Sequence, residues 1–218
     1  KKHLTGKKVL VTAGPTREPL DPVRFLSNHS TGKMGYALAR AAWLRGASVT
    51  LVTGPTALTP PPVDEVIAIE TVGEMYDAVM DHADADILIK AAAVGDYKAA
   101  SVAEQKIKKT GEGIELALVR TPDILAELGK RKRPGQLLCG FAMETERLCE
   151  NAERKRKAKN ADMIVANDLK TPGAGFAGDT NVVTLLTDAG AEALPILSKD
   201  EVADAILDRL VAMGRSDG

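Results

Sequence analysis

The sequence predicts an α/β fold, a three-layer Rossmann-like arrangement in which helices cover both faces of a mostly parallel sheet. Short apolar runs alternate with amphipathic helical patterns along the 218-residue chain, and such alternation produces parallel strands joined by crossover helices. Two segments, 97–119 and 182–196, break the alternation. We expect these segments to pair with each other or with a second subunit, and the first to form a small β-rich insert that acts as a flap and in dimerisation.

Strands are predicted where short apolar runs end in glycine, proline or polar residues. In chain order they cover residues 8–12, 48–52, 66–69, 86–90, 114–119, 137–140 and 163–166. A hairpin of residues 182–186 and 193–196 around the turn at 188–190 then completes the β structure.

Helices are predicted from apolar residues at helical spacing and from capping residues at their starts. They cover residues 32–44, 71–82, a segment from 121 onward, 145–159 and a segment from 198 onward. Capping boxes open the second and the last helix, at Thr71 and Ser198. The third helix is expected to have Thr121 as its cap and Pro122 at its first helical position.

Composition places the chain among cytoplasmic globular proteins with one domain, residues 1–218. A net charge of −1 gives no reason to expect nucleic-acid or membrane partners, and no apolar run approaches the ~20 residues of a membrane helix. The two cysteines and three histidines have no metal-type spacing, so we expect no zinc site. Residues 1–6, basic and polar, are expected to be the remnant of an inter-domain linker.

The most informative segment is 27–35, Ser-Asn-His-Ser-Thr-Gly-Lys-Met-Gly, which joins a polar loop to the first predicted helix. A helix start carries several backbone N–H groups without intrahelical partners, and the macrodipole adds partial positive charge. Gly32 and Gly35 let an anion approach this backbone, and Ser30 and Thr31 are able to cap the helix or bind a phosphate oxygen. The segment therefore predicts a site for a nucleotide or a phosphorylated substrate.

Four polar or glycine-rich segments follow strand ends, and ligands of doubly wound sheets bind beyond the carboxyl ends of the strands. These segments are residues 14–31, 91–96, 140–144 and 167–179. Their expected convergence at one edge of the sheet predicts a single ligand site.

Two common nucleotide motifs do not match the chain. The first turn begins Gly14-Pro-Thr rather than GxGxxG, and the second strand ends in Thr53-Gly-Pro without an acid, which disfavours a nicotinamide cofactor. A P-loop fails because Met34 stands where a hydroxyl should hold magnesium and position 27 is not glycine. A glycine-rich turn needed only for packing remains the alternative to a ligand site.

Three further segments keep two interpretations each. Residues 91–96 are either a plain strand end, with Asp96 as a cap, or a surface of small residues for a ligand. The lysine cluster at 106–109 is either solvated or a lid over a triphosphate. Lys155 and Lys159 share a helix face, but cations near a helix C-terminus need no ligand, and spacing alone favours that reading. No nucleophile–base spacing involves the histidines or cysteines.

With these residues assembled, the chain resembles phosphopantothenoylcysteine synthetase, the ligase half of the bifunctional bacterial coenzyme A enzyme. The resemblance covers nearly the whole chain and rests on several long motifs in the right order. They are residues 13–24 (AGPTREPLDPVR), 27–35 (SNHSTGKMG), 91–97 (AAAVGDY), 106–109 (KIKK), 140–145 (GFAMET) and 166–168 (AND). Three residues depart from the usual pattern, namely Thr31, Gly95 and Met143.

The resemblance implies a CTP-dependent ligase that uses Mg²⁺. The carboxylate of 4′-phosphopantothenate would attack the α-phosphate of CTP, and the amine of L-cysteine would then displace CMP from the acyl-cytidylate to form an amide. It also implies a homodimer with shared active sites, fused to or assembled with a phosphopantothenoylcysteine decarboxylase domain. Two other functions stay open, an NAD(P)-dependent oxidoreductase on a similar sheet and a catalytically idle scaffold.

Roles carried over by motif divide the site into groups. Asn28 and Lys106 are the expected catalytic residues, with Lys106 on a mobile flap. The expected nucleotide-binding residues are Gly14, Ser30, Gly32, Gly35, Asp96, Lys106, Pro122, Asp123, Ile124, Leu125, Phe141, Lys155 and Lys159. The expected substrate-binding residues are Asn28, Ala92, Ala93, Asp96 and Asn167, of which Ala92, Ala93 and Asp96 would meet ligand from the neighbouring subunit. The resemblance assigns no metal ligand.

Overall fold

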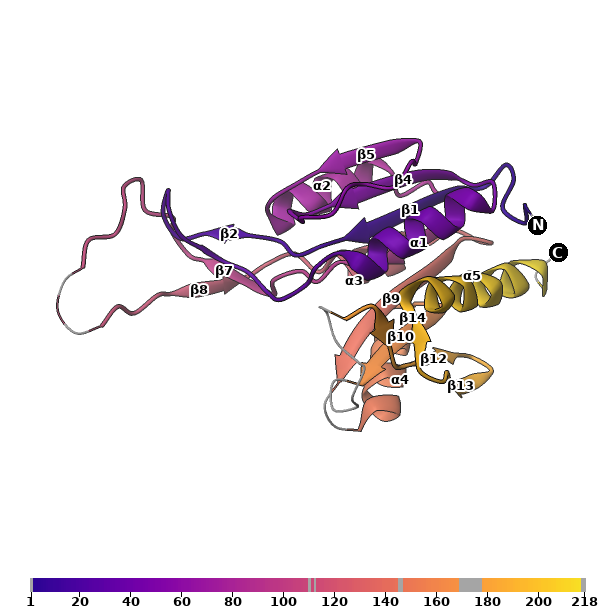
Figure 1. Cartoon of the computed structure of the whole chain (residues 1–218). Helices are drawn as coiled ribbons and strands as arrows, with labels where there is room; N and C mark the ends of the chain where they lie inside the picture. The colour runs from indigo at the N-terminus through magenta and orange to yellow at the C-terminus, as the bar shows by residue number, and fades with distance from the viewer. Residues whose placement is uncertain (1, 110, 112, 145–146, 169–177, 217–218) are drawn as a thin grey trace.

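A computed structural model of the chain describes residues 2–109, 111, 113–144, 147–168 and 178–216. Its centre is an eight-stranded sheet in the order β13-β12-β10-β9-β6-β1-β4-β5 (Figure 1). The strands are β1 (Lys8–Ala13), β4 (Ser48–Thr53), β5 (Glu65–Ala68), β6 (Ile87–Lys90), β9 (Leu137–Glu144), β10 (Met163–Asp168), β12 (Val183–Thr187) and β13 (Gly190–Ala193). All strand pairs from β5 to β10 are parallel, and β12 and β13 add an antiparallel edge.

Helices cover both faces of this sheet, which confirms the predicted fold class. They are α1 (Lys33–Leu44), α2 (Val72–Asp81), α3 (Ile124–Arg131), α4 (Leu148–Ala158) and α5 (Lys199–Ser216). Alternate strand residues face opposite sides: Val9 and Val11 of β1 pack in the cluster that contains α1 and α5 residues. Leu10 between them packs in the cluster of α2, α3 and α4. The central strands are therefore buried on both faces, as their continuous apolar runs require.

Helix starts differ from the expectations at three places. α1 is capped by Gly32 in a left-handed conformation (φ 81°) with no side-chain cap, so neither Ser30 nor Thr31 caps it. Asp123, whose side chain accepts a hydrogen bond from the Ala126 N–H, caps α3, so Thr121 and Pro122 precede the helix. α4 begins at Leu148 rather than at 145, after Arg147 with φ 48°. The capping boxes at Thr71 and Ser198 are confirmed.

Several strand ends also differ from their predicted positions. Residues 140–144, expected as a loop, form the second half of β9, where they pair with β10. The second strand of the hairpin is residues 190–193 instead of 193–196, because Thr187 pairs directly with Gly190 across a two-residue turn. Most of the fourth predicted loop, residues 169–177 of 167–179, lies outside the described residues, as does Thr145.

An extended arm projects from the sheet (Figure 1) and consists of the insert and of the ribbon formed by β2 (Glu18–Pro19) and β3 (Phe25–Leu26). The strands of the insert are β7 (Tyr97–Ala99) and β8 (Leu118–Arg120), which pair with each other, and β7 contacts β2. The prediction that the insert pairs with the 182–196 hairpin is therefore wrong. Of the predicted strand 114–119 only residues 118–119 are a strand, which continues to Arg120. Pairing with a second subunit stays a prediction.

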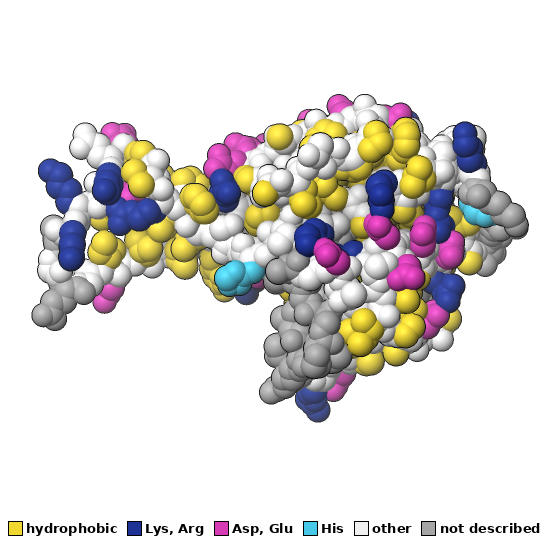
Figure 2. Space-filling view, in the orientation of Figure 1, with side chains coloured by type: hydrophobic (Ala, Val, Ile, Leu, Met, Phe, Trp, Pro, Cys, Tyr) yellow, Lys and Arg dark blue, Asp and Glu magenta, His cyan; other side chains and the backbone are white. Residues whose placement is uncertain are grey.

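Asp21 joins the two ribbons of the arm. Its carboxylate accepts hydrogen bonds from the backbone N–H groups of Val23, Arg24 and Ile107, and from the Arg24 guanidinium. Burial acts to raise the pKa of Asp21, but these donors outweigh it and hold the pKa well below its usual range. The arm is nevertheless rich in exposed apolar side chains (Figure 2), namely Val23, Phe25, Tyr97, Val102, Ile114, Leu116, Leu118 and Val119.

The N-terminal segment packs on the body of the fold. Leu4 is buried, and its N–H donates to the carbonyl of Arg45 at the end of α1. Two small strands, β11 (Thr180–Asn181) and β14 (Leu197–Ser198), pair just before α5. Among the described residues, none of the helices has both the length and the apolar character needed to cross a bilayer.

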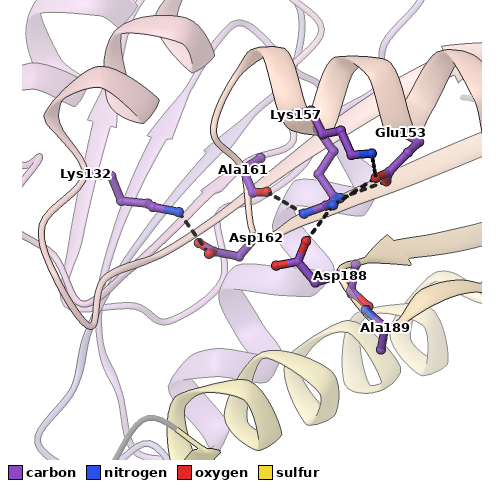
Figure 3. Close-up of polar contacts among 9 residues, drawn as sticks. Lys132, Glu153, Lys157, Ala161, Asp162, Asp188 and Ala189 are labelled. Carbon is purple, nitrogen blue, oxygen red and sulfur yellow. Dashed lines mark hydrogen bonds and ion pairs between the residues drawn. The ribbon is translucent and has the colours of Figure 1, made fainter.

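Arg156 anchors α4 to the sheet. Its guanidinium donates to both carboxylate oxygens of Glu153, to Asp188 in the β12–β13 turn, and to the Ala161 carbonyl (Figure 3). The Arg156 side chain is nearly buried, and Glu153 is its main partner, so the pair raises the pKa of the guanidinium. These contacts fix the orientation of the helix that carries Lys155.

Replacing Arg156 with methionine is expected to lower the free energy of unfolding by about 1.5–3 kcal/mol, the range for hydrogen bonds to charged groups. Denaturant unfolding measures this change. Lys157→Met is the control, because Lys157 pairs with the same Glu153 from an exposed position and should change stability by less than about 1 kcal/mol. Equal effects of the two substitutions would contradict the anchoring role.

Candidate active site

A cavity of about 370 Å³ lies at the carboxyl ends of the central strands. Most of the expected site residues line it, namely Gly14, Asn28, Ser30, Gly32, Gly35, Ala92, Ala93, Asp96, Phe141, Lys155 and Asn167. A second cavity of about 300 Å³ shares Lys90, Val94, Asp96 and Lys155 with the first and is lined by the other group, Pro122, Asp123, Ile124, Leu125 and Lys159. The two cavities therefore adjoin each other, and we refer to them together as the cleft. Lys106, exposed on the arm, lines neither cavity in the single chain.

The start of α1, with the positive end of its helix dipole, lines the first cavity. No acidic residue occupies its first turn, all of which lies within the described residues. The N–H groups of Gly32 and Lys33 reach the hydroxyls of Ser30 and Thr31 only at 3.4 Å, which makes these hydrogen bonds weak. Backbone N–H groups and the helix dipole therefore offer an anion site at this wall of the cavity.

Glycines bring this helix start close to β1. A Cβ atom on Gly35 would lie 2.4 Å from the Ala13 Cβ and 3.0 Å from the Thr12 carbonyl oxygen. Because no side chain is accommodated at that distance, only glycine lets α1 begin directly above the end of β1. Gly35 thus determines where the helix N–H groups point.

Asn28 ties the 27–35 loop to the segment after β6. Its amide nitrogen donates to the Ala93 carbonyl at 2.7 Å, and its amide oxygen accepts from the Ser30 N–H at 3.0 Å. The Ala93 N–H in turn donates to the Gly14 carbonyl. The stretch 91–96 therefore lines the cavity beside the first turn, which favours the ligand surface over a plain strand end. Asp96 does not cap a helix, since β7 follows it.

Lysines supply the charge of the cleft. The Lys155 ammonium donates to the Phe141 carbonyl at 2.8 Å, and Lys159 pairs with Asp123 at 2.6 Å. The positions of Lys155 and Lys159 on their helix did not by themselves predict that these lysines line the cleft. The cleft is completed by β9 and α3, which are distant from them in sequence. Burial acts to raise the pKa of Asp123, but the hydrogen bond from Lys159 holds it below its usual range.

Sequence reasoning missed four polar residues that line the first cavity, Lys33, Lys90, Asn181 and Lys199. Lys90 carried a signal, since it is a single charge at the end of the apolar strand Ile87–Lys90. Burial, assisted by the nearby Lys155 charge, lowers the pKa of Lys90 to about 8. Asn181 and Lys199 carried none, because they come from β11 and α5 near the far end of the chain.

The two cysteines and His29 do not line the cleft. Cys139 is buried within β9, and burial raises the pKa of its thiol. Cys149 is exposed on α4. None of these residues lines the two cavities, so no nucleophilic thiol or imidazole belongs to the cleft as the described residues form it.

The fold and the cleft together define an α/β protein with a candidate ligand site beyond the carboxyl ends of its parallel strands. The chain matches the family described as DNA/pantothenate metabolism flavoprotein C-terminal domain over residues 4–213, and it belongs to that family. It is 49% identical over 218 residues to the coenzyme A biosynthesis bifunctional protein CoaBC of Bacillus subtilis (strain 168), covering 99% of this chain and 53% of that protein. The chain thus spans about half the length of the curated relatives it matches.

Solved structures agree with the fold. The crystal structure of the C-terminal domain of CoaBC has a TM-score of 0.85 and 44% identity, covering 99% of this chain and 100% of that one. The DNA/pantothenate metabolism flavoprotein from Streptococcus pneumoniae has a TM-score of 0.83 and 26% identity, covering 95% and 100%. The predicted Rossmann-like class and the family resemblance are both confirmed.

Binding of a polyphosphate is expected to weaken as the pH rises through about 8, where Lys90 loses its charge. The Lys90 pKa is below its ordinary value of 10.5, so the folded protein binds fewer protons than the unfolded chain between these two values. The burial of the charged Lys90 therefore lowers the free energy of unfolding below about pH 8, and this loss of stability becomes smaller as the pH rises. Calorimetric titration with inorganic tripolyphosphate across this range measures the binding.

Lys90→Met should weaken this binding about 10- to 100-fold near neutral pH, the loss of one charged hydrogen bond, and should flatten the pH profile. Lys130→Met, an exposed lysine of α3, is the control and should leave both unchanged. A pH profile that persists in the Lys90 variant would assign the titration to another group.

Proposed function

We propose that this chain is a phosphopantothenate–cysteine ligase that uses CTP and acts in coenzyme A biosynthesis. The observation that carries the proposal is the pair of adjoining cavities: the α1 start lines the larger one, and Lys90 and Lys155 line both. Membership of the family and the names of its relatives, coenzyme A biosynthesis bifunctional proteins, support the same assignment.

The reaction divides into two balanced steps. A carboxylate oxygen of 4′-phosphopantothenate attacks the α-phosphorus of CTP, the bond to the β-phosphate oxygen breaks, and pyrophosphate leaves. The neutral amine of L-cysteine then attacks the acyl carbon, the bond to CMP breaks, and the amide forms as the nitrogen releases a proton to water. A carboxylate is a poor electrophile until its oxygen belongs to a good leaving group, so the first step makes the second possible.

The two cavities suit the two parts of the nucleotide. In this proposal the smaller cavity at the start of α3 takes the nucleoside, where Lys159 and Asp123 form its polar wall. The triphosphate extends into the larger cavity toward the α1 start and Lys155. Positioned N–H groups and ammonium groups stabilise the charge that develops on the departing pyrophosphate. Mg²⁺, when bound, would add further neutralisation of the triphosphate.

A second subunit is part of the proposal. The arm exposes a row of apolar side chains, and larger exposed apolar patches mark interaction surfaces. We place Lys106 in the active site of the partner subunit, because in its own chain it lies on the arm and lines neither cavity. A cytoplasmic location and a covalently linked decarboxylase domain belong to the same proposal.

Mass spectrometry of the protein with CTP, Mg²⁺ and phosphopantothenate, with cysteine omitted, is expected to detect the acyl-CMP adduct together with released pyrophosphate. Adding cysteine should convert the adduct to the amide and CMP. Nucleotide binding without pyrophosphate release would indicate a scaffold. Thermal stabilisation by NADPH but not by CTP would instead favour the oxidoreductase.

Asn28→Asp is expected to slow amide formation by up to about 100-fold, the size associated with a misplaced reacting group, and to affect CTP affinity much less. The reason is that the new carboxylate would face the Ala93 carbonyl oxygen, which the Asn28 amide now reaches at 2.7 Å. Single-turnover kinetics and calorimetry separate the two quantities, and a thermal melt checks folding. Unchanged turnover would remove Asn28 from the mechanism.

A further inference from the structure

Two buried amide oxygens in the larger cavity have no partner among the described residues. Asn167 at the end of β10 is 4% exposed and Asn181 of β11 is 3% exposed, and both line the cavity. The Oδ1 atom of each accepts no hydrogen bond within the part of the chain that the structure describes. Buried polar atoms are normally satisfied, so this pair calls for a ligand that offers positive charge or donors.

The surroundings of the two oxygens favour anions. Lys33 at the first turn of α1 and Lys199 at the start of α5 line the same cavity. The Lys33 ammonium pairs with Asp179 at 2.7 Å, and the Lys199 ammonium donates to the Gly178 carbonyl at 2.5 Å. A polyphosphate at this wall offers oxygen atoms but no donors. Amide oxygens beside it would repel it unless a cation lay between them.

We propose that the amide oxygens of Asn167 and Asn181 receive the divalent cation that accompanies the nucleotide triphosphate, as ligands or as acceptors for its bound waters. This inference rests on the proposed function, because the triphosphate supplies the remaining oxygen ligands. Mg²⁺ prefers oxygen, keeps several waters and combines few protein groups with phosphates. No group of three His, Cys, Asp or Glu side chains within the described residues could hold a metal ion by itself, so phosphate oxygens and waters would supply most of the cation's ligands.

Two other ligands would satisfy the same oxygens. The amide groups could be turned to donate their nitrogens to phosphate, since the two orientations of an asparagine amide are assigned from their partners. N–H or O–H donors of the second substrate could also meet them. Neither alternative needs a metal. Each therefore predicts effects of Asn→Asp and Asn→Leu substitutions on metal binding and on metal-free nucleotide binding that differ from those our proposal predicts.

The test uses the full chain and Mn²⁺ as a paramagnetic probe, titrated by electron paramagnetic resonance with CTP present and phosphopantothenate absent. Asn167→Leu and Asn181→Leu should weaken Mn²⁺ binding to the CTP complex about 10- to 100-fold, the usual loss for groups that support a metal. Asn→Asp at either position should strengthen Mn²⁺ binding, because a carboxylate attracts the cation more than an amide does. CTP affinity measured with EDTA should stay unchanged in the Leu variants.

Asn151→Asp is the matched control, because it makes the same substitution on α4 at a residue that lines neither cavity. It should leave Mn²⁺ binding unchanged. Circular dichroism checks folding, and Asn→Ala replaces any Leu variant that fails to fold.

Three outcomes would overturn the inference. Metal-free CTP affinity that falls in both the Leu and Asp variants would identify phosphate-binding amides. Mn²⁺ and CTP binding that are unchanged in every variant, with a raised KM for a second substrate, would identify a substrate contact. Both results leave the proposed ligase intact, whereas a protein that fails to bind CTP at all would remove the ligase and this inference together.

Discussion

The close approach of α1 to β1 is the constraint on which the site depends. Gly35 has no room for a Cβ atom against Ala13, so the helix begins directly above the end of the strand. Gly32 turns the chain with φ 81°, and a Cβ there would lie 2.7 Å from the Thr56 methyl. Because the helix start is fixed in this way, its N–H groups face the cavity before any ligand binds, and an anion would pay little reorganisation cost on arrival.

Four lysines gather around that fixed helix start. Lys90 and Lys155 line both the larger and the smaller cavity, and Lys33 and Lys199 line the larger one. Burial and a neighbouring ammonium lower the pKa of Lys90, and burial with the Lys33 charge lowers that of Lys199. Such clustering of like charges destabilises the fold by itself, and an anionic ligand would offset it.

Local sequence was sufficient for most elements, because each depended on contacts within a few residues. The apolar run at Val9 predicted a strand, and Thr71 with Glu74 predicted a capping box, and the structure contains both. The wrong predictions concern positions where a contact with a residue distant in sequence determines the local structure. The hydroxyl of Thr121 donates to the Gly95 carbonyl instead of capping α3, and residues 140–144 continue as a strand because β10 lies beside them.

The sequence by itself determined the fold class, the family and the glycine-bearing start of the first helix, since glycine spacing and apolar periodicity are local properties of the chain. Only the tertiary structure decided which side chains meet at the cleft. Lys90 at the end of β6 lines the same cavity as Asn181 of β11 and Lys199 at the start of α5, and only the packing of these segments brings the three together. Burial, and with it the altered pKa of Lys90 and the unpartnered oxygen of Asn181, exists only after those segments have packed together.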